Sequence, residues 1–168
     1  MKRFHHLLRT TRGNAAVEMA LVTPLLLILM MGSMELGNYF LDEHALVKAV
    51  RDGARFAARQ NFSNYTCPGA TIGGTVVADT QNVVRTGQVS GGTQRLTQAG
   101  TITVTVACPT AAGGQNMLGI YRVSSGTPYA PVVTVSATVP YTPVMKSFGF
   151  NGIGMNLNAK QQAAVMGL

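Results

Sequence analysis

The feature that most constrains this chain is an apolar run from Met19 to Met34 that contains no charged residue. Glu18 precedes the run and Glu35 follows it. Counted as a helix from Gly13 to Gly37 at ~1.5 Å per residue, the segment is about as long as the hydrocarbon core of a bilayer is thick. The run therefore predicts a transmembrane helix over residues 14–37.

Glu18 is the exception in this segment, because it lies in the first turn of the expected helix. A carboxylate costs about 2.5–3.5 kcal/mol at the centre of a span, and less near the interface. Either Glu18 lies shallow enough to reach the headgroups, or it is kept to pair with another group inside the membrane. The residues alone leave both interpretations open.

Residues 1–13 form a basic leader that contains no acid; its bases are Lys2, Arg3, Arg9 and Arg12. Basic residues just before a span favour a cytoplasmic N-terminus, which places the C-terminal part outside the cytoplasm. Because the leader is similar to a secretory n-region, a cleaved signal peptide is the alternative. The apolar run is long for such a peptide and no clear Ala-x-Ala site follows it, so we expect the span to be retained.

Two features inside the span bear on how it packs. Pro24 is expected to kink the helix, which a membrane setting tolerates. Ser33 and Gly37 form a small-x-x-x-small pair that lets another helix approach closely. Ordinary glycine usage in transmembrane helices explains the pair equally well.

Residues 38–60 are expected to extend the helix beyond the bilayer, because they contain no Pro and a single Gly. Their apolar residues recur at three- to four-residue spacing and predict one buried face: Phe40, Val47, Val50, Ala54 and Ala57. Arg51, Arg55 and Arg59 form a basic row, expected on a solvated face of the same amphipathic helix; contact with lipid headgroups or a neighbouring subunit is the alternative.

Residues 61–168 are expected to fold as a separate head. A short helix is predicted over residues 74–86, ended by Gly87. Three stretches alternate between apolar and polar residues, as half-buried strands do; their apolar positions are Ile102, Val104 and Val106, then Val133, Val135, Ala137 and Val139, then Met155, Leu157, Ala159, Ala163 and Val165. Residues 159–166 fit a helix as the alternative, and Met117 to Val123 add a possible short strand.

A sheet with one apolar face needs a cover, and the amphipathic half of the long helix is the obvious one. The predicted fold class is therefore α+β. A long N-terminal helix, with a transmembrane half and an amphipathic half, packs on a small antiparallel sheet.

Composition and motifs exclude several classes of function. The formal charge is +7, but four of the thirteen bases lie in the leader, and the remaining nine bases and six acids leave +3. With no Trp and no basic cluster interleaved with aromatics, nucleic-acid binding is not expected. Asp79 is the single acid outside the long helix, and His44 has no evident partner, so we expect no enzyme activity, no metal site and no cofactor. His5 and His6 are adjacent in the leader, and a metal site built on them is not expected.

The N-terminal pattern resembles a type IV prepilin: a basic leader, Gly13, then Glu18 and an apolar helix with an early Pro24. The string from Ala15 to Leu27, with Glu35-Leu36-Gly37 and Arg51-Asp52-Gly53-Ala54-Arg55, is more specifically similar to the TadE-like family of minor pilins or pseudopilins of the tight-adherence pilus system. The resemblance covers residues 13–58.

That resemblance implies a pilin-like fold and cleavage by a prepilin peptidase between Gly13 and Asn14, with Glu18 near the cut. In type IV pilins the matching Glu pairs with the new α-amino group of a neighbouring subunit. By this analogy Glu18 is an assembly residue, and Pro24, Ser33 and Gly37 belong to the same helix-packing surface.

The implied role is assembly of a tight-adherence (Flp-type) pilus. The implied partners are the peptidase, other pilins, the inner-membrane assembly platform and the lipid bilayer. The implied location is a bacterial inner membrane, crossed once, with the head in the periplasm or within a pilus at the cell surface. The alternative function is a membrane-anchored periplasmic binding or adhesive module that is neither processed nor assembled.

The two cysteines, Cys67 and Cys108, have no Cys-x-x-Cys spacing that would suggest a metal or redox site. If the head is exported it meets an oxidising compartment, where such a pair usually closes into a disulfide. Two buried thiols are the alternative, and they require that the predicted span be wrong.

Overall fold

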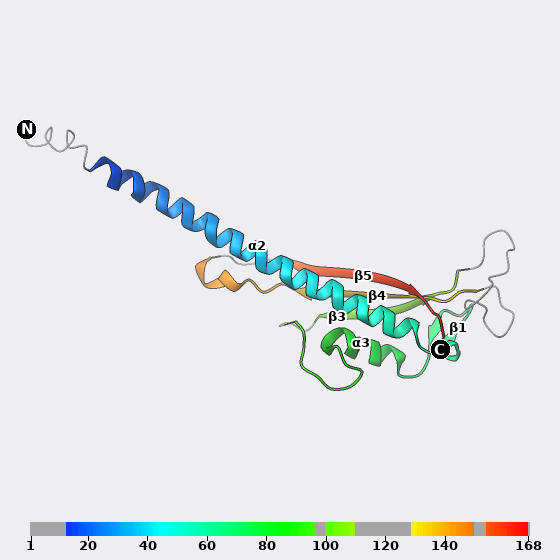
Figure 1. Ribbon diagram of the computed structural model, residues 1–168. Helices are drawn as coiled ribbons and strands as arrows, with labels where there is room; N and C mark the ends of the chain where they lie inside the picture. Colours follow the sequence, from blue (N-terminus) through cyan, green and yellow to red (C-terminus); the bar gives the residue numbers. More distant parts are fainter. Residues whose placement is uncertain (1–12, 97–99, 110–128, 150–153, 168) are drawn as a thin grey trace, which may run out of the picture.

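The computed structural model describes residues 13–96, 100–109, 129–149 and 154–167. The leader before Gly13 and the possible strand from Met117 to Val123 lie outside these residues. The described elements form a long helix that carries a small α+β head at its C-terminal half, as Figure 1 shows. The predicted fold class is confirmed.

Helix α2 runs from Asn14 to Ala58, so the two predicted helical segments form one continuous element of 45 residues. It continues without a break through Pro24. Next to Pro24, the Thr23 hydroxyl donates a hydrogen bond to the Met19 carbonyl at 2.6 Å. The kink expected at Pro24 stays a prediction.

The buried face of the second half of α2 differs in part from the predicted one. Its core residues are Leu46, Ala49, Val50, Ala54, Ala57 and Ala58, each 2% exposed or less. The prediction was wrong for Phe40 and Val47, which are 49% and 37% exposed. At 3.6 residues per turn, Phe40 is rotated about 80° from Val50, whereas Tyr39 is rotated by only about 20°. Tyr39 accordingly packs on the core in place of Phe40.

Three antiparallel strands form the main sheet, in the order β3-β4-β5. They are β3 (Thr101–Ala107), β4 (Val132–Pro140) and β5 (Asn156–Ala164), and all three predicted strands are confirmed. Val104 faces Val135 in the first pair, and Ala137 faces Ala159 in the second. Because β5 pairs with β4 as far as Ala164, the helical alternative for residues 159–166 is wrong.

The apolar face of the sheet carries the core of the head. Val133, Val135, Ala137 and Val139 of β4 are at most 4% exposed, and Leu157 and Val165 contribute from the β5 side. Met155 is the exception among the predicted apolar positions: it is 48% exposed, because it precedes Asn156, where pairing with β4 begins. Helix α2 packs over β4 and β5, and thereby provides the cover that the sequence predicts.

Helix α3 spans Val76–Thr86 and confirms the short helix predicted there. It packs against α2 and β3, and buries Val76, Thr80, Val83 and Val84. Gly87 ends it in the left-handed conformation with φ 83°, a backbone state that favours glycine. The Gly87 N–H returns a hydrogen bond to the Val83 carbonyl.

The segment between the two helices contains short elements that the sequence pattern did not predict. A 3-10 turn, η1 (Phe62–Asn64), leads into β1 (Tyr65–Thr66) and β2 (Thr71–Ile72), which pair with each other. The Tyr65 hydroxyl donates a hydrogen bond to the Ala57 carbonyl and so ties this segment to the last turn of α2.

A second 3-10 turn, η4 (Val144–Phe148), lies between β4 and β5.

Candidate membrane-anchoring and assembly surface

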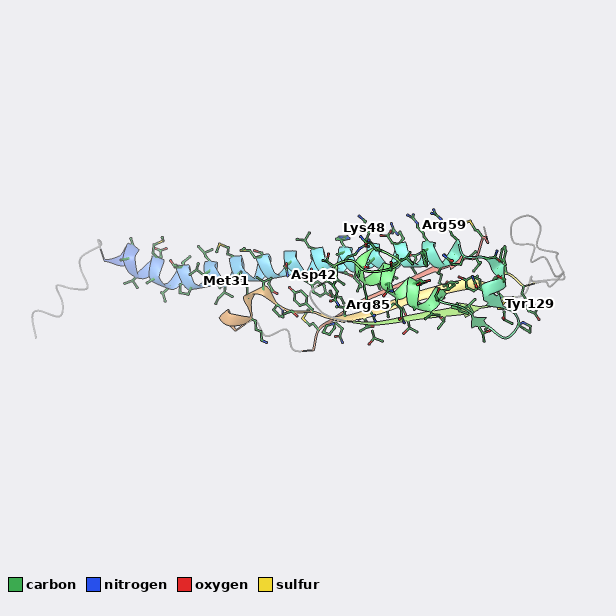
Figure 2. All side chains as sticks on the ribbon, turned by 90° about the horizontal axis from the view of Figure 1, so that it is seen from below. Met31, Asp42, Lys48, Arg59, Arg85 and Tyr129 are labelled. Carbon is green, nitrogen blue, oxygen red and sulfur yellow. A yellow bond between two sulfur atoms is a disulfide. The ribbon has the colours of Figure 1, made fainter. Side chains whose placement is uncertain are left out.

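The N-terminal part of α2 extends beyond the head. From Ala15 to Met30 every side chain is exposed, and the large apolar ones include Leu21 at 74% and Leu29 at 61%. Figure 2 shows these side chains projecting freely to both sides of the helix. Residues 14–34 cover about 31 Å at ~1.5 Å per residue, close to the thickness of a bilayer core. The helix is long and apolar enough to cross a membrane.

Gly13 lies at the N-cap of α2 and is exposed, with Asn14 as the first helical residue. The Gly13 carbonyl accepts a hydrogen bond from the Val17 N–H at 3.2 Å. The peptide bond between Gly13 and Asn14 therefore belongs to the first turn, and a peptidase that cuts there must open this turn.

Glu18 is the fifth residue of α2 and is exposed. The first turn contains no acidic residue, so Glu18 lies just after that turn and not within it, although the helix begins at Asn14 as predicted. Its carboxylate lies on a free stretch of helix, about one turn from the bond after Gly13.

Pro24 and Ser33 lie along the same free stretch, whereas Gly37 lies just past Glu35, beside the open groove between α2 and η4. Ser33 donates its hydroxyl to the Met30 carbonyl at 2.8 Å, which satisfies the polar group within the helix. A Cβ built on Gly37 would have no heavy atom within 4 Å, so nothing in the head covers this position. In this chain Ser33 and Gly37 are both exposed, so the small-residue pair is uncovered by the head.

Glu35 holds a contact that the sequence analysis missed. Its carboxylate accepts hydrogen bonds from the backbone N–H groups of Val144 at 3.2 Å and Met145 at 2.9 Å, and from the Tyr141 hydroxyl. Two of these bonds join α2 to the start of η4, and the third joins α2 to the residue that follows β4, each across more than a hundred residues of sequence. The head therefore begins, along the helix axis, where the uncharged run ends.

Two further residues of α2 complete this junction. Asn38 donates its side-chain N–H to the Tyr141 hydroxyl at 3.2 Å, and the Tyr39 ring meets the Tyr141 ring edge-on at 5.2 Å between centroids. Burial and the hydrogen bond to Glu35 raise the pKa of Tyr141 above its ordinary value. The hydroxyl stays protonated at neutral pH, as a donor to the carboxylate requires.

The sequence contains both residues of this junction in noticeable positions, but no pattern in it pairs Glu35 with Tyr141. Glu35 is the first charge after the apolar run, and Tyr141 follows a strongly alternating strand. A buried Tyr usually places its hydroxyl on a partner. The sequence does not say which of the acids in α2 would be that partner, because this depends on the tertiary register of helix and sheet.

The structure brings the two cysteines together. Cys67 and Cys108 form a disulfide with their Cα atoms 5.8 Å apart and a sequence separation of 41. The prediction of this bond is confirmed, and the alternative of two buried thiols is wrong. The bond joins the turn between β1 and β2 to the end of β3.

The basic row of α2 lies on the outside of the head. Arg51, Arg55 and Arg59 are exposed, as predicted for a solvated face. Asp52, on the adjacent side of the helix, pairs with Arg95 at 3.1 Å and so fixes the segment after α3 against α2.

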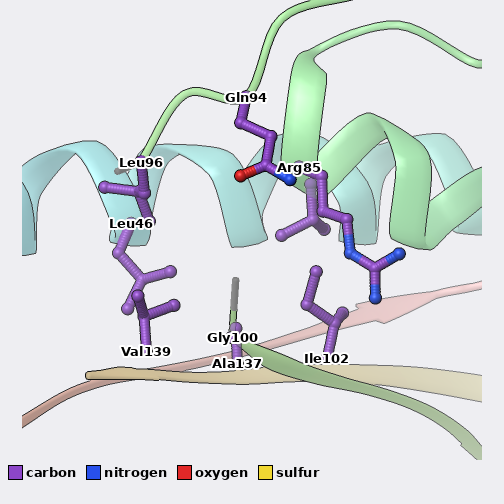
Figure 3. Close-up of a pocket in the computed structure, with 9 residues that line it drawn as sticks. Leu46, Arg85, Gln94, Leu96, Gly100, Ile102, Ala137 and Val139 are labelled. Atoms are coloured by element: carbon purple, nitrogen blue, oxygen red, sulfur yellow. The ribbon is translucent and has the colours of Figure 1, made fainter. Parts of the chain in front are cut away.

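Figure 3 shows a cavity between α2, α3 and the sheet. Leu46, Val84, Ile102 and Val139 are among the residues that line it, and its volume is about 30 Å³. Sites for small molecules usually measure about 300–1,000 Å³, so this cavity is a packing defect of the core. Among the described residues, no three His, Cys, Asp or Glu side chains gather in a group that could hold a metal ion.

Comparison with known proteins gives one match. A family model described as TadE-like protein matches residues 13–55, which includes Gly13, Glu18 and the whole free part of α2. No curated protein and no solved structure matches the chain. The resemblance to the TadE-like family is confirmed over this region.

Proposed function

We propose, from the TadE-like match over residues 13–55, that this protein is a minor pilin or pseudopilin that takes part in assembly of a tight-adherence pilus. A prepilin peptidase removes residues 1–13, and the helix then packs with other pilins at the inner-membrane assembly platform. The head lies in the periplasm or within the pilus.

The observation that carries this proposal is the free, fully exposed apolar part of α2, which begins at the residue where the peptidase would cut. Side chains from Ala15 to Met30 have no cover in the head, yet they are too apolar to remain in water. A bilayer covers them before assembly, and the helices of other subunits cover them afterwards. An unprocessed anchor explains the apolar run but gives Gly13 and Glu18 no role.

Processing is tested by intact mass. Coexpression with a matching prepilin peptidase is expected to yield a protein that begins at Asn14, whereas Gly13→Phe is expected to keep residues 1–13. Gly32→Phe, a bulky change in the same helix with nothing within 4 Å, is the matched control and should be cut normally. Residues 1–13 on the unaltered protein from peptidase-positive cells would favour the unprocessed membrane module.

The role of Glu18 is tested separately from processing. Cleavage places a new α-amino group one helical turn from Glu18, and a carboxylate in a dry helix bundle needs such a partner. Glu18→Gln and Glu18→Ala are expected to insert and be cleaved normally, yet to be lost from complexes. Breaking one side of a buried pair costs roughly 3–5 kcal/mol, which lowers incorporation by orders of magnitude.

The measurement is the yield of crosslinked or copurified pilin partners, beside an immunoblot that reports cleavage. Glu43→Gln removes a carboxylate from the part of α2 outside the span and serves as the control. If Glu18→Ala enters complexes as well as the control does, Glu18 merely reaches the headgroups, and the assembly role is lost.

The location of the head is tested through its disulfide. Protein from the cell envelope is expected to resist alkylation at both Cys67 and Cys108 unless a reductant is added first. Full labelling after unfolding without reductant would place the head in the cytoplasm and reverse the proposed orientation.

A further inference from the structure

The turn η4 lies beside the end of the apolar run. A groove of about 360 Å³ separates the two elements, and it is lined by Met34 and Glu35 of α2 and by Val144 and Met145 of η4. Met34 is the last residue of the uncharged run. In Figure 1 the orange segment that contains η4 is the part of the head nearest the N-terminal half of α2. If α2 crosses a bilayer over residues 14–34, this turn lies at the bilayer surface.

The exposed chemistry of the turn fits that position. Val144 is 64% exposed, and Lys146, two residues on, is also exposed. On the neighbouring helix Met34, Leu36 and Leu41 are each more than half exposed. Apolar side chains beside a lysine suit the interface, where the apolar groups enter the acyl boundary and the cation stays with the headgroups.

Glu35 fixes the turn at this level. Its carboxylate binds two successive backbone N–H groups at the start of η4, and Tyr141 and Asn38 extend the same network. The carboxylate satisfies both backbone N–H groups with charge-assisted hydrogen bonds, and so holds the start of the turn against α2. Val144, which is held by this contact, lines the groove together with Met34 at the end of the apolar run.

We infer that the Val144–Phe148 turn is a membrane foot: it rests in the headgroup region of the bilayer that α2 crosses, and Glu35 positions it. The occupant of this surface is lipid, because the turn is continuous with the apolar span and lies at its end. The inference rests on the proposed membrane insertion of α2. It adds a second point of contact, which sets the depth and tilt of the head.

The chain contains no Trp, so a single introduced Trp reports its own surroundings. The full-length protein is reconstituted in vesicles of phosphatidylcholine and phosphatidylglycerol, with and without lipids brominated on the acyl chains near the glycerol. Three variants are compared: Val144→Trp at the foot, Leu27→Trp within the span, and Met166→Trp at the far end of the head. At that end the backbone N–H of Met166 donates a hydrogen bond to the Ala58 carbonyl.

If the turn rests in the headgroup region, Val144→Trp is expected to emit at shorter wavelength than Met166→Trp. Brominated lipid should quench much of the Val144→Trp emission and none of the Met166→Trp emission. Leu27→Trp separates the two proposals. If Leu27→Trp is quenched and Val144→Trp is not, the foot is wrong and the membrane anchor stands. If Leu27→Trp is not quenched, the anchor itself fails. A blue-shifted but unquenched Val144→Trp means that protein, and not lipid, covers the turn, which also overturns the foot.

The role of Glu35 is tested in the Val144→Trp background. Glu35→Ala is expected to reduce the quenching and shift the emission to longer wavelength, because the turn is no longer held at the surface. Glu43→Ala, which removes a carboxylate about two turns further along α2, should leave both unchanged. Equal quenching in the two double variants would show that Glu35 does not position the foot.

Discussion

Both ends of helix α2 carry an apolar surface, yet the two surfaces meet opposite surroundings. Residues 14–34 are rich in Leu and Met, and the side chains from Ala15 to Met30 are all exposed. Residues 46–58 are rich in Ala, and the residues of their buried face are at most 2% exposed. Large side chains without a protein partner indicate a lipid solvent, whereas small ones let a sheet and a second helix approach closely. The two ends therefore differ in the size of their apolar residues and in charge, since residues 46–58 include Lys48, Arg51, Asp52 and Arg55 and residues 14–34 include Glu18 alone.

The largest expected effect comes from a core leucine. Leu46→Ala should lower the free energy of unfolding of the head by about 2–5 kcal/mol, because it enlarges the cavity that Leu46 already lines. Leu27→Ala, the same change on the free part of the helix, should alter it by less than about 0.5 kcal/mol. Denaturation in detergent micelles, followed by circular dichroism, measures both. Similar losses would mean that residues 14–34 pack on the head.

A charge introduced into α2 should have its larger effect in the free half, on membrane insertion. Leu27→Arg should disfavour membrane insertion by about 2.5–3.5 kcal/mol, the cost of a cation near the centre of a span. Val47→Arg places the same charge on an exposed position of the head half, and insertion should be unaffected. The fraction of protein that stays with membranes after carbonate extraction is the readout. Full retention of Leu27→Arg would contradict a span centred on this residue.

Two glycines sharpen the contrast at smaller scale. A Cβ on Gly53 would overlap the Val84 side chain of α3, whereas one on Gly32 would meet nothing within 4 Å. Gly53→Val is therefore expected to destabilise the head by about 1–3 kcal/mol through overpacking. Gly32→Val should leave the denaturation midpoint in place. A stable Gly53→Val would show that α2 and α3 separate more easily than their close packing suggests.

The smallest effect concerns a single hydroxyl. Tyr65→Phe removes the hydrogen bond to the Ala57 carbonyl and should cost about 1 kcal/mol at neutral pH, near the net value of one buried hydrogen bond. The same denaturation assay measures it. No loss would mean that water replaces the hydroxyl at the end of α2.

Tyr65 also predicts a loss of stability at alkaline pH. Burial raises the pKa of Tyr65 from 10.0 to about 12, so the folded state keeps a proton that the unfolded state has released. Its contribution is complete below pH 10 and is lost as the pH rises from 10 to about 12. The Tyr65→Phe variant should lack this part of the alkaline decline, and equal declines in the two proteins would exclude Tyr65 as its source.

Sequence patterns predicted the elements of this fold better than their contacts. Alternation of Val and Thr identified β3 and β4, because one face of each strand is buried and the period of two is strict. The long helix was predicted from an apolar run and from the absence of proline after Pro24. The buried face of α2 was partly misread, since a count at three- and four-residue spacing drifts around the helix and favoured Phe40 over Tyr39.

The junction at Glu35 and Tyr141 shows what the sequence could not provide. These residues lie 106 positions apart, and their contact depends on how far the sheet slides along α2 before it packs. No local signal fixes that register. The two-residue strands β1 and β2 were missed for a similar reason: Tyr65 and Ile72 pair within a short turn that has no periodicity to detect.

The disulfide gives the head a particular response to pulling. A force applied between the N-terminal helix and the strands β4 and β5 travels along the backbone to Cys67, crosses the sulfur bridge to Cys108, and continues toward the sheet. The intervening residues, which include β2, α3 and β3, form a closed covalent ring outside this path. Tension on an assembled fibre would therefore bypass α3, and the ring could be stretched only after the bond between the two cysteines is broken.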